Sequence, residues 1–161
     1  MHKRTFEIVS QVHQFLINKG LTISVAESCT GGFLSHLLTL LPGSSAFFGA
    51  GIVSYSIKAK EKILGISQIT VAEHGVVSGQ AAKEMAEKVR ALTKTGFSIS
   101  TTCNLGPDML EGKDRGLIYI AVSSEHGTAV RELKLAGNRE NNKEAAAVAS
   151  LELLLEVIRG A

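Results

Sequence analysis

The chain alternates apolar runs with segments of helical period, and this alternation restricts the folds that it can adopt. Apolar residues spaced by three and four predict helices, and short apolar runs predict strands. The predicted helices cover 5–19, 30–40, 58–64, 79–96 and 138–159, and the predicted strands cover 21–26, 47–56, 97–103, 116–123 and 128–136. The expected buried faces carry Phe6, Val9, Val12, Phe15 and Leu16 in the first helix, and Ala82, Met85, Ala86, Val89 and Leu92 in the fourth.

Cap and turn signals indicate how these elements connect. Ser78 and Asn138 are expected N-caps of the two long helices, and "SEHG" at 124–127 predicts a hairpin between the last two strands. Helices between the earlier strands make those strands parallel. We predict one α/β domain over residues 1–161, with α/β/α layers around a mixed, mostly parallel sheet that includes a late antiparallel hairpin. With 161 residues and 45% hydrophobic content, the chain is long enough to bury one hydrophobic core and falls in the size range of a single domain.

Charge and composition favour a small-molecule partner. The 17 basic and 15 acidic residues give a net charge of +2 without a basic block, which excludes the usual pattern of a nucleic-acid binder. The first 20 residues interleave polar side chains, so we expect no signal peptide, no membrane span and a cytoplasmic location. The apolar run at 117–122 and the Leu-rich last helix favour a homo-oligomer.

Cysteine and histidine placement predicts no metal and no bound cofactor. Cys29 and Cys103 are too few for a disulfide framework, lack zinc-site spacing and favour a reducing compartment. The five histidines are scattered, and no fingerprint for a bound dinucleotide is present.

The stretch "AESCTGGF" at 26–33 contains several small and polar residues at the connection between a predicted strand and a predicted helix. Ser28 stands there as a candidate nucleophile, since amides at a helix start can stabilise an oxyanion. The alternative is that Ser28 or Thr30 only caps the helix. Cys29 is either a nucleophile with a histidine base or a small buried core residue. Gly31 and Gly32 either let a phosphate group approach the backbone or allow the helix to pack closely.

Two cationic positions near helix starts are unusual. Lys58 and Lys60 fall in the first turn after Ser56, where the helix dipole disfavours cations and favours a neutral amine that can act as a base. Tyr55 could relay or orient the proton. The alternative is a solvated lysine face. Arg139, at the start of the last helix, is either an anion clamp or an exposed side chain. The loops after strands, 27–32, 54–60 and 102–115, are expected to form the site.

Six segments, taken together, resemble a known family. They are "AESCTGG", "LPGSSAFF", "GIVSYSIKAKEKILGI", "HGVVS", "GLIYIAV" and "AGNRE". From Leu21 to Leu155 the chain resembles the C-terminal domain of competence-damage-inducible protein A (CinA), the nicotinamide-nucleotide amidase family. The resemblance implies that a stand-alone domain of this kind hydrolyses the carboxamide of nicotinamide mononucleotide to nicotinate mononucleotide and ammonia, in pyridine-nucleotide salvage and without a cofactor.

The resemblance also implies residue roles. Ser28 would be the nucleophile, Lys60 its base and Tyr55 an assisting group. The implied substrate-binding residues are Thr30, Gly31, Gly32, Ser44, Ser45, Thr102 and Arg139.

The chain departs from the family pattern at three places. The usual T-G-x-A-G-P has Cys103 and Leu105 in place of small residues, Ile57 and Lys58 replace Asn-Glu, and Asn138 replaces an aspartate. Added side chains in a tight site require rearrangement. Two alternatives therefore stay open: a catalytically silent nucleotide-binding or regulatory relative with a remodelled 102–110 loop, and a non-catalytic assembly protein.

Overall fold

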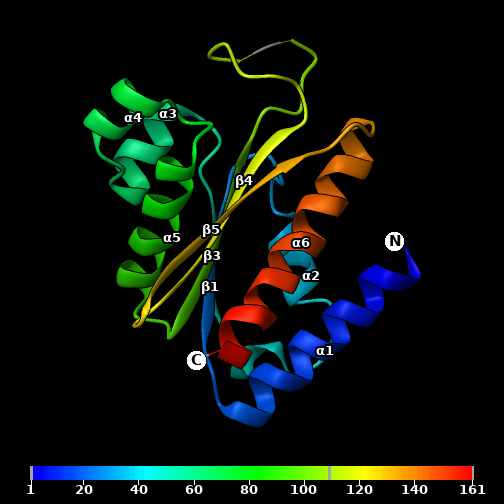
Figure 1. Cartoon of the computed structure of the whole chain (residues 1–161). Helices are drawn as coiled ribbons and strands as arrows, with labels where there is room; N and C mark the ends of the chain where they lie inside the picture. Colours follow the sequence, from blue (N-terminus) through cyan, green and yellow to red (C-terminus); the bar gives the residue numbers. More distant parts are fainter. Residues whose placement is uncertain (1, 109, 161) are drawn as a thin grey trace.

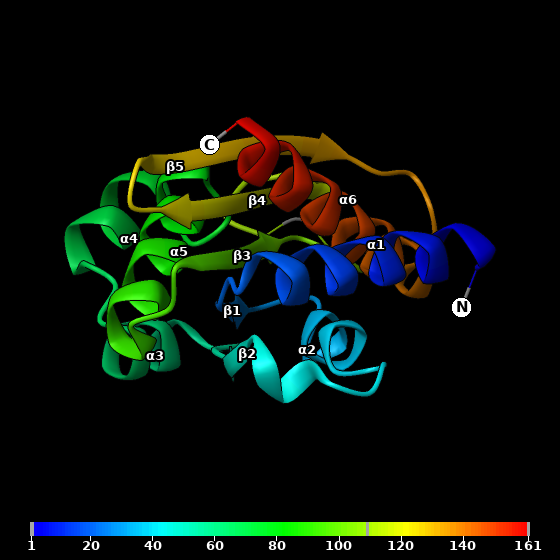
Figure 2. The ribbon, with the colours of Figure 1, turned by 90° about the horizontal axis from the view of Figure 1, so that it is seen from below.

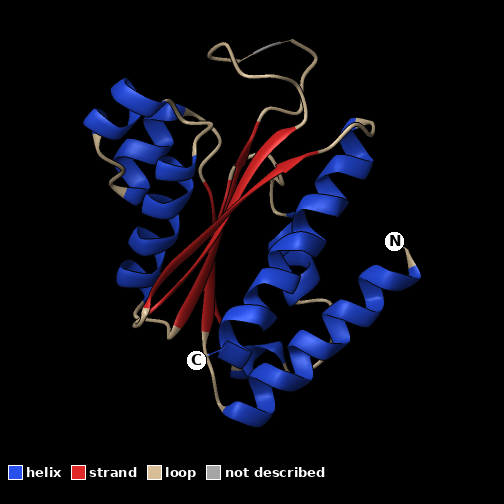
Figure 3. Ribbon diagram, viewed as in Figure 1, coloured by secondary structure: helices blue, strands red, loops and turns tan. Residues whose placement is uncertain are grey.

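The protein forms three layers, with a central sheet between two groups of helices (Figures 1 and 3). The computed structural model describes residues 2–108 and 110–160; Met1, Met109 and Ala161 lie outside the described part. The strands are β1 (Ile23–Glu27), β2 (Phe48–Val53), β3 (Phe97–Cys103), β4 (Leu117–Ser124) and β5 (Gly127–Lys134). The α-helices are α1 (Lys3–Lys19), α2 (Phe33–Leu38), α3 (Ile57–Ala59), α4 (Gln68–His74), α5 (Gly79–Thr93) and α6 (Arg139–Gly160), with a 3-10 turn η1 (Ser44–Ala46) and a π-helical turn η2 (Lys60–Leu64).

The five strands are ordered β2-β1-β3-β4-β5. The β2–β1 and β1–β3 pairs are parallel, whereas β3–β4 and β4–β5 are antiparallel. The predicted single α/β domain with a mixed sheet and a late hairpin is therefore confirmed. The expectation that the sheet is mostly parallel is wrong: parallel and antiparallel pairings are equal in number, because the 104–116 segment returns from β3 to β4 without a crossover helix.

Helices from distant parts of the sequence cover each face of the sheet. The long α5 packs on β1, β3 and β4 together with α3, η2 and α4 at one face, and α1, α2 and α6 lie at the other (Figures 1 and 2). The main hydrophobic core lies between the sheet and α1, α2 and α6. Beneath α5 the core is thinner, because Ala82 and Ala86 meet Ala121 of β4 and let the helix approach closely. In residues 2–108 and 110–160, no helix is long and apolar enough to cross a membrane.

Most of the predicted helix faces are buried, with two exceptions. Ala82, Met85, Ala86 and Val89 of α5 are fully buried, but Leu92 is 61% exposed because it lies at the margin of that stripe. Phe6, in the first turn of α1, is also exposed. The predicted cap Ser78 accepts a hydrogen bond from the amide of Ala81 at 3.1 Å. Helix α4 was not predicted.

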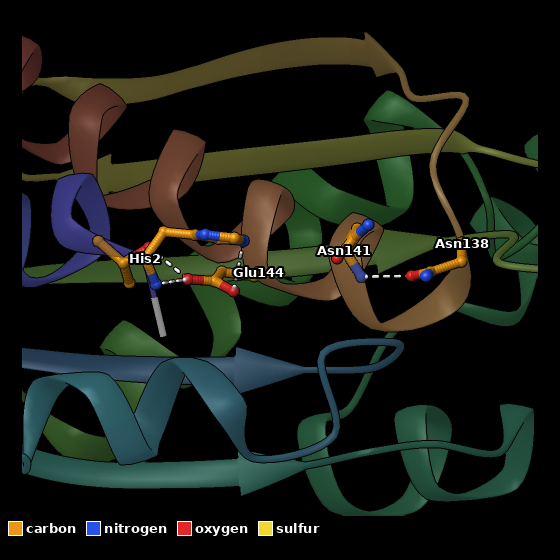
Figure 4. A network of polar contacts seen from close by, with 5 residues as sticks. His2, Asn138, Asn141 and Glu144 are labelled. Carbon is orange, nitrogen blue, oxygen red and sulfur yellow. Dashed lines mark hydrogen bonds and ion pairs between the residues drawn. The ribbon is translucent and has the colours of Figure 1, made fainter.

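The start of α6 is fixed by a cap and by a contact with the start of α1 (Figure 4). The side-chain oxygen of Asn138 accepts a hydrogen bond from the amide of Asn141 at 2.8 Å, as predicted for an N-cap. One turn further along, Glu144 accepts a hydrogen bond from the amide of His2 at 2.9 Å. Arg139 is the first residue of α6 and lies within this fixed turn.

Candidate active site

The loops that follow β1, β2 and β3 meet at one end of the sheet, as the sequence predicts. They enclose a cavity of about 130 Å³. The lining residues are Ser28, Cys29, Tyr55, Lys60, Val76, Val77, Thr102, Cys103, Asn104, Leu105, Gly106, Leu110 and Arg139. Parallel strands present their carboxyl ends on the same side of a sheet, which is why loops so far apart in sequence converge.

Lys60 points into the protein and reaches Ser28. Its Nζ lies 2.9 Å from Ser28 Oγ, 2.8 Å from the Ser54 carbonyl oxygen and 3.2 Å from the Tyr55 carbonyl oxygen. A neutral amine has two N–H groups for the two carbonyls and one lone pair for the serine hydroxyl. The geometry therefore suits proton transfer from Ser28 to Lys60.

Burial adjusts the acidity of this lysine. Lys60 is only 1% exposed. Burial disfavours the charged ammonium and lowers the pKa of Lys60 to about 8, while the Glu111 carboxylate acts in the opposite direction. A substantial fraction of Lys60 is therefore neutral near physiological pH.

Local structure explains why Lys60 is buried when its neighbours are not. Ser56 caps the short α3 by accepting a hydrogen bond from the amide of Ala59 at 3.0 Å. Lys60 then opens the π-helical turn η2, a kind of turn that is frequent at functional sites. Lys58 and Lys62 are exposed. The alternative of a solvated lysine face therefore holds for Lys58 and Lys62 and is wrong for Lys60.

Glu27 caps α2, a role that the sequence analysis assigned to Ser28 or Thr30. The Glu27 side chain is fully buried and accepts hydrogen bonds from the amides of Gly32, Leu34 and Ser35 at 3.0, 3.0 and 2.8 Å. The alternative that Ser28 or Thr30 only caps the helix is therefore wrong, and the Ser28 hydroxyl is free of a capping role and contacts Lys60. Sequence reasoning missed Glu27; an acidic residue just before a glycine-containing strand-to-helix turn is the signal that could have indicated it.

The loop backbone also suits an acyl-transfer site. The amide of Ser28 donates to the Thr101 carbonyl at 3.0 Å, and the amide of Gly31 donates to the Ser28 carbonyl at 3.1 Å. In the part of the chain that the structure describes, the amides of Cys29 and Thr30 donate to no protein acceptor. Such amides next to a nucleophile can bind an oxyanion.

Tyr55 and Arg139 join two sides of the cavity. Arg139 donates one hydrogen bond to the Tyr55 hydroxyl at 2.8 Å and another to the Gly106 carbonyl at 3.1 Å. The Tyr55 hydroxyl thus contacts Arg139, while its carbonyl holds Lys60. Thr102 lines the cavity and donates to the Val76 carbonyl at 2.6 Å.

The remaining predicted binding residues do not line this cavity. The Thr30 side chain is buried against Thr101, with 2.7 Å between the hydroxyl oxygens. Gly31 and Gly32 form the turn, with φ of +59° and +95°, a conformation that glycine adopts without strain.

Ser44 and Ser45 lie at the other end of the sheet. Their turn precedes β2, whereas Ser28 follows the parallel strand β1. Within this chain they therefore do not lie beside Ser28, and their role in substrate binding stays a prediction.

Cys29 and Cys103 are joined as a disulfide, with their Cα atoms 5.8 Å apart. The treatment of the two cysteines as unpaired is wrong, and Cys29 is not a free nucleophile. Seventy-four positions separate them in sequence, and only the β1–β3 pairing makes them neighbours.

Two other cavities are larger than the one beside Ser28. One of about 450 Å³ is lined by Phe33, Arg139, Glu140, Lys143 and Glu144, and it shares Arg139 with the Ser28 cavity. Another, of about 690 Å³, lies at the opposite end of the sheet, where Lys19, Arg90 and Arg159 each stand in the last turn of a helix. Basic residues are favourable at helix C-termini, so they indicate no ligand by themselves. Over 2–108 and 110–160, no three His, Cys, Asp or Glu side chains gather in a metal-binding group.

Comparisons with known proteins agree with the fold. The family model of the CinA C-terminal domain matches residues 5–158. A putative competence-damage inducible protein of Caldanaerobacter subterraneus is 39% identical over 155 residues, covering 96% of this chain and 38% of that protein. Its counterpart in Acetivibrio thermocellus is 47% identical over 127 residues, covering 78% of this chain and 31% of that protein. The chain thus spans less than two fifths of the length of these relatives.

Solved structures extend the comparison. The competence damage-inducible protein A from Klebsiella pneumoniae superposes with a TM-score of 0.93 at 30% identity, covering 96% of this chain and 97% of that one. The competence/damage inducible protein CihA from Agrobacterium tumefaciens gives a TM-score of 0.92 at 30% identity, covering 97% and 96%. The chain belongs to the CinA C-terminal domain family.

Proposed function

We propose that the protein is an amidohydrolase that converts nicotinamide mononucleotide and water to nicotinate mononucleotide and ammonia, with Ser28 as nucleophile and Lys60 as base. The observation that carries this proposal is the 2.9 Å contact between a buried lysine and a serine hydroxyl at the end of β1. A serine activated by a lysine is a known variant of nucleophilic catalysis.

The reaction follows from the arrangement of these groups. Neutral Lys60 accepts the Ser28 proton as Oγ bonds to the carboxamide carbon, and the amides of Cys29 and Thr30 bind the oxyanion. The tetrahedral intermediate then breaks its C–N bond, and the Lys60 ammonium gives its proton to the departing ammonia. Water attacks the resulting ester, Lys60 accepts a proton from that water, and this proton returns to Ser28 Oγ as the C–O bond breaks; the carboxylic acid product then gives its own proton to solvent and leaves as the carboxylate.

Two adjoining cavities suit a substrate with two parts. The cavity of about 130 Å³ beside Ser28 accommodates the carboxamide end, and the cavity of about 450 Å³ takes the ribose phosphate. Arg139 lines both cavities, and Lys143 lines the larger one. Cations at this position attract a phosphate group.

The direct test is ammonia release from nicotinamide mononucleotide by the purified chain, without added metal. Ser28→Ala and Lys60→Met should each lower kcat at least about 10³-fold, because each removes a member of one catalytic unit. Lys58→Met is the matched control, since Lys58 is exposed and two positions away. It should keep kcat within about twofold. Turnover that survives in Ser28→Ala would contradict the assignment.

A second candidate function is a nucleotide-binding or regulatory protein without turnover. The observation that favours it is that Cys103, Leu105 and Leu110 line the cavity beside Ser28, whose volume is only about 130 Å³. This candidate predicts that nicotinamide mononucleotide raises the thermal midpoint of the wild-type chain while no ammonia is released. The relatives are longer than this chain, so any activity of their other segments belongs to those proteins.

A further inference from the structure

The disulfide lies next to the proposed nucleophile. Cys29 is the residue after Ser28, and Cys103 is the last residue of β3. Their Cα separation of 5.8 Å falls in the range that a disulfide spans without backbone movement. The bond therefore ties the Ser28 loop to the strand beside it.

Both cysteines are buried, yet both line the active-site cavity. Cys29 is 6% exposed and Cys103 is 7% exposed. The cavity that contains Ser28 and Lys60 includes both of them in its wall. The bond therefore lies in the wall of the space that the substrate would use.

Breaking the bond requires the sulfur atoms to separate. Bonded sulfurs lie about 2 Å apart, whereas unbonded atoms need about 3.5–4 Å. Because both side chains are buried, the separation must be absorbed by the Ser28 loop and the end of β3, which carry them. One residue separates this movement from Ser28 Oγ, and a displacement of about 1 Å at a reacting group can cost about 10²-fold in rate.

Other contacts limit how far the loop can move. The Ser28 amide remains bonded to the Thr101 carbonyl, and the Thr30 and Thr101 hydroxyls stay in contact. These bonds do not involve the cysteines, so the end of β1 stays in place when the disulfide opens. The movement falls on the turn that follows, where the amides of Gly31 and Gly32 donate to the Ser28 carbonyl and to Glu27 and lose protection from exchange. The expected change is a shift of the nucleophile and not unfolding of the domain.

We propose that Cys29 and Cys103 form a reversible thiol–disulfide switch in which the oxidised pair holds Ser28 against Lys60 and reduction disengages it. Oxidation joins the two thiols while one molecule of a low-molecular-weight disulfide accepts two electrons and two protons and becomes two thiols. Reduction by a dithiol reverses this exchange, and the dithiol becomes a disulfide. The effect on turnover rests on the proposed amidase function, whereas the bond and the loop movement do not.

The test compares the wild-type chain after equilibration with oxidised glutathione and after treatment with a dithiol. Alkylation of the denatured protein should count no free thiols in the first sample and two in the second. Deuterium uptake of peptides covering 28–32 should rise on reduction, and kcat/KM for ammonia release should fall at least about 10-fold. The double variant Cys29→Ala/Cys103→Ala is the control, because a chain without these two thiols forms neither an internal nor a mixed disulfide, so its kcat/KM and deuterium uptake should be the same in both conditions.

The outcomes separate this inference from the proposed function. Two free thiols after oxidation overturn the switch, and so does unchanged deuterium uptake in 28–32 on reduction. If turnover is measurable, an equal kcat/KM in the oxidised and the reduced state also overturns the switch. Absence of turnover in both states contradicts the amidase proposal alone, since the thiol count and deuterium uptake still decide whether the switch exists.

Discussion

The pH dependence of turnover offers a sharp test of the role of Lys60. Only the neutral amine can accept the Ser28 proton, so the rate should follow the fraction of Lys60 that is unprotonated. With a pKa of about 8, about 9% of Lys60 is neutral at pH 7, compared with about 0.03% for a lysine of pKa 10.5. Burial therefore raises the population of the active form about 300-fold at neutral pH.

The assay is kcat/KM for ammonia release, measured from pH 6 to pH 10. The values should rise tenfold per pH unit at low pH and level off above about pH 8, because kcat/KM reports the ionisation of the free enzyme. A profile that is flat from pH 6 to pH 8 would refute the role of Lys60 as base. A profile that still rises tenfold per pH unit up to pH 10, as expected for an ordinary lysine with a pKa of 10.5, would refute the effect of burial.

A single substitution tests the electrostatic part of this reasoning. The Glu111 carboxylate raises the pKa of Lys60 against the larger effect of burial. Glu111→Gln should therefore move the midpoint of the kcat/KM profile to lower pH. Glu125→Gln, at an exposed residue in the β4–β5 turn, should leave the midpoint in place. If the midpoint does not move in Glu111→Gln, the Glu111 carboxylate does not affect the pKa of Lys60.

Three further predictions concern stability and positioning. The unfolded chain binds more protons than the fold between pH 8 and 10.5, so urea unfolding should show wild type gaining about 3 kcal/mol relative to Lys60→Met across that window. The penalty of burying Lys60 is complete below pH 8 and is lost above 10.5. Glu27→Gln should lower the free energy of unfolding by about 1–3 kcal/mol, because a buried acceptor of several amides is removed, while exposed Glu125→Gln changes it little. Arg139→Ala should lower kcat/KM about 10-fold with little change in thermal midpoint, since this exposed residue bridges two sides of the cavity; exposed Arg159→Ala is its control.

Each of these three predictions has an outcome that would contradict it. Parallel stability curves for wild type and Lys60→Met would mean that the lysine titrates alike in folded and unfolded chains. Full stability in Glu27→Gln would mean that the amides of α2 need no carboxylate. Equal kcat/KM in Arg139→Ala and Arg159→Ala would exclude a positioning role for Arg139.

Local sequence signals determined much of the fold. The apolar run of β3 was predicted with its observed bounds, and the caps Ser78 and Asn138 mark the starts of α5 and α6. These features depend on hydrogen bonds and periodicities within a few residues, so the sequence contains them in full. Helix α4 was missed because its short stretch has no strong apolar period, and its cap, Ser67, is the only clear local signal.

The sequence also indicated which loops form the site, because the carboxyl ends of parallel strands gather on one side of a sheet. It proposed Ser28 and Lys60 as partners from their residue types, their places at helix starts and the family resemblance. Their 2.9 Å contact and the burial of Lys60 are properties of the folded chain. No spacing along the sequence distinguishes Lys60 from the exposed Lys58 and Lys62.

Only the tertiary structure decided the contacts between distant segments. The Cys29–Cys103 pair depends on the register of β1 against β3, and the cap formed by Glu27 depends on how the loop folds back over its own carboxylate. The place of Ser44 and Ser45, at the end of the sheet away from Ser28, was also decided by the fold, because a sequence motif carries no information about which end of the sheet its residues occupy. Periodicity is a property of neighbours along the chain, whereas burial, charge and bonding in this site arise from segments that meet only after the sheet has formed.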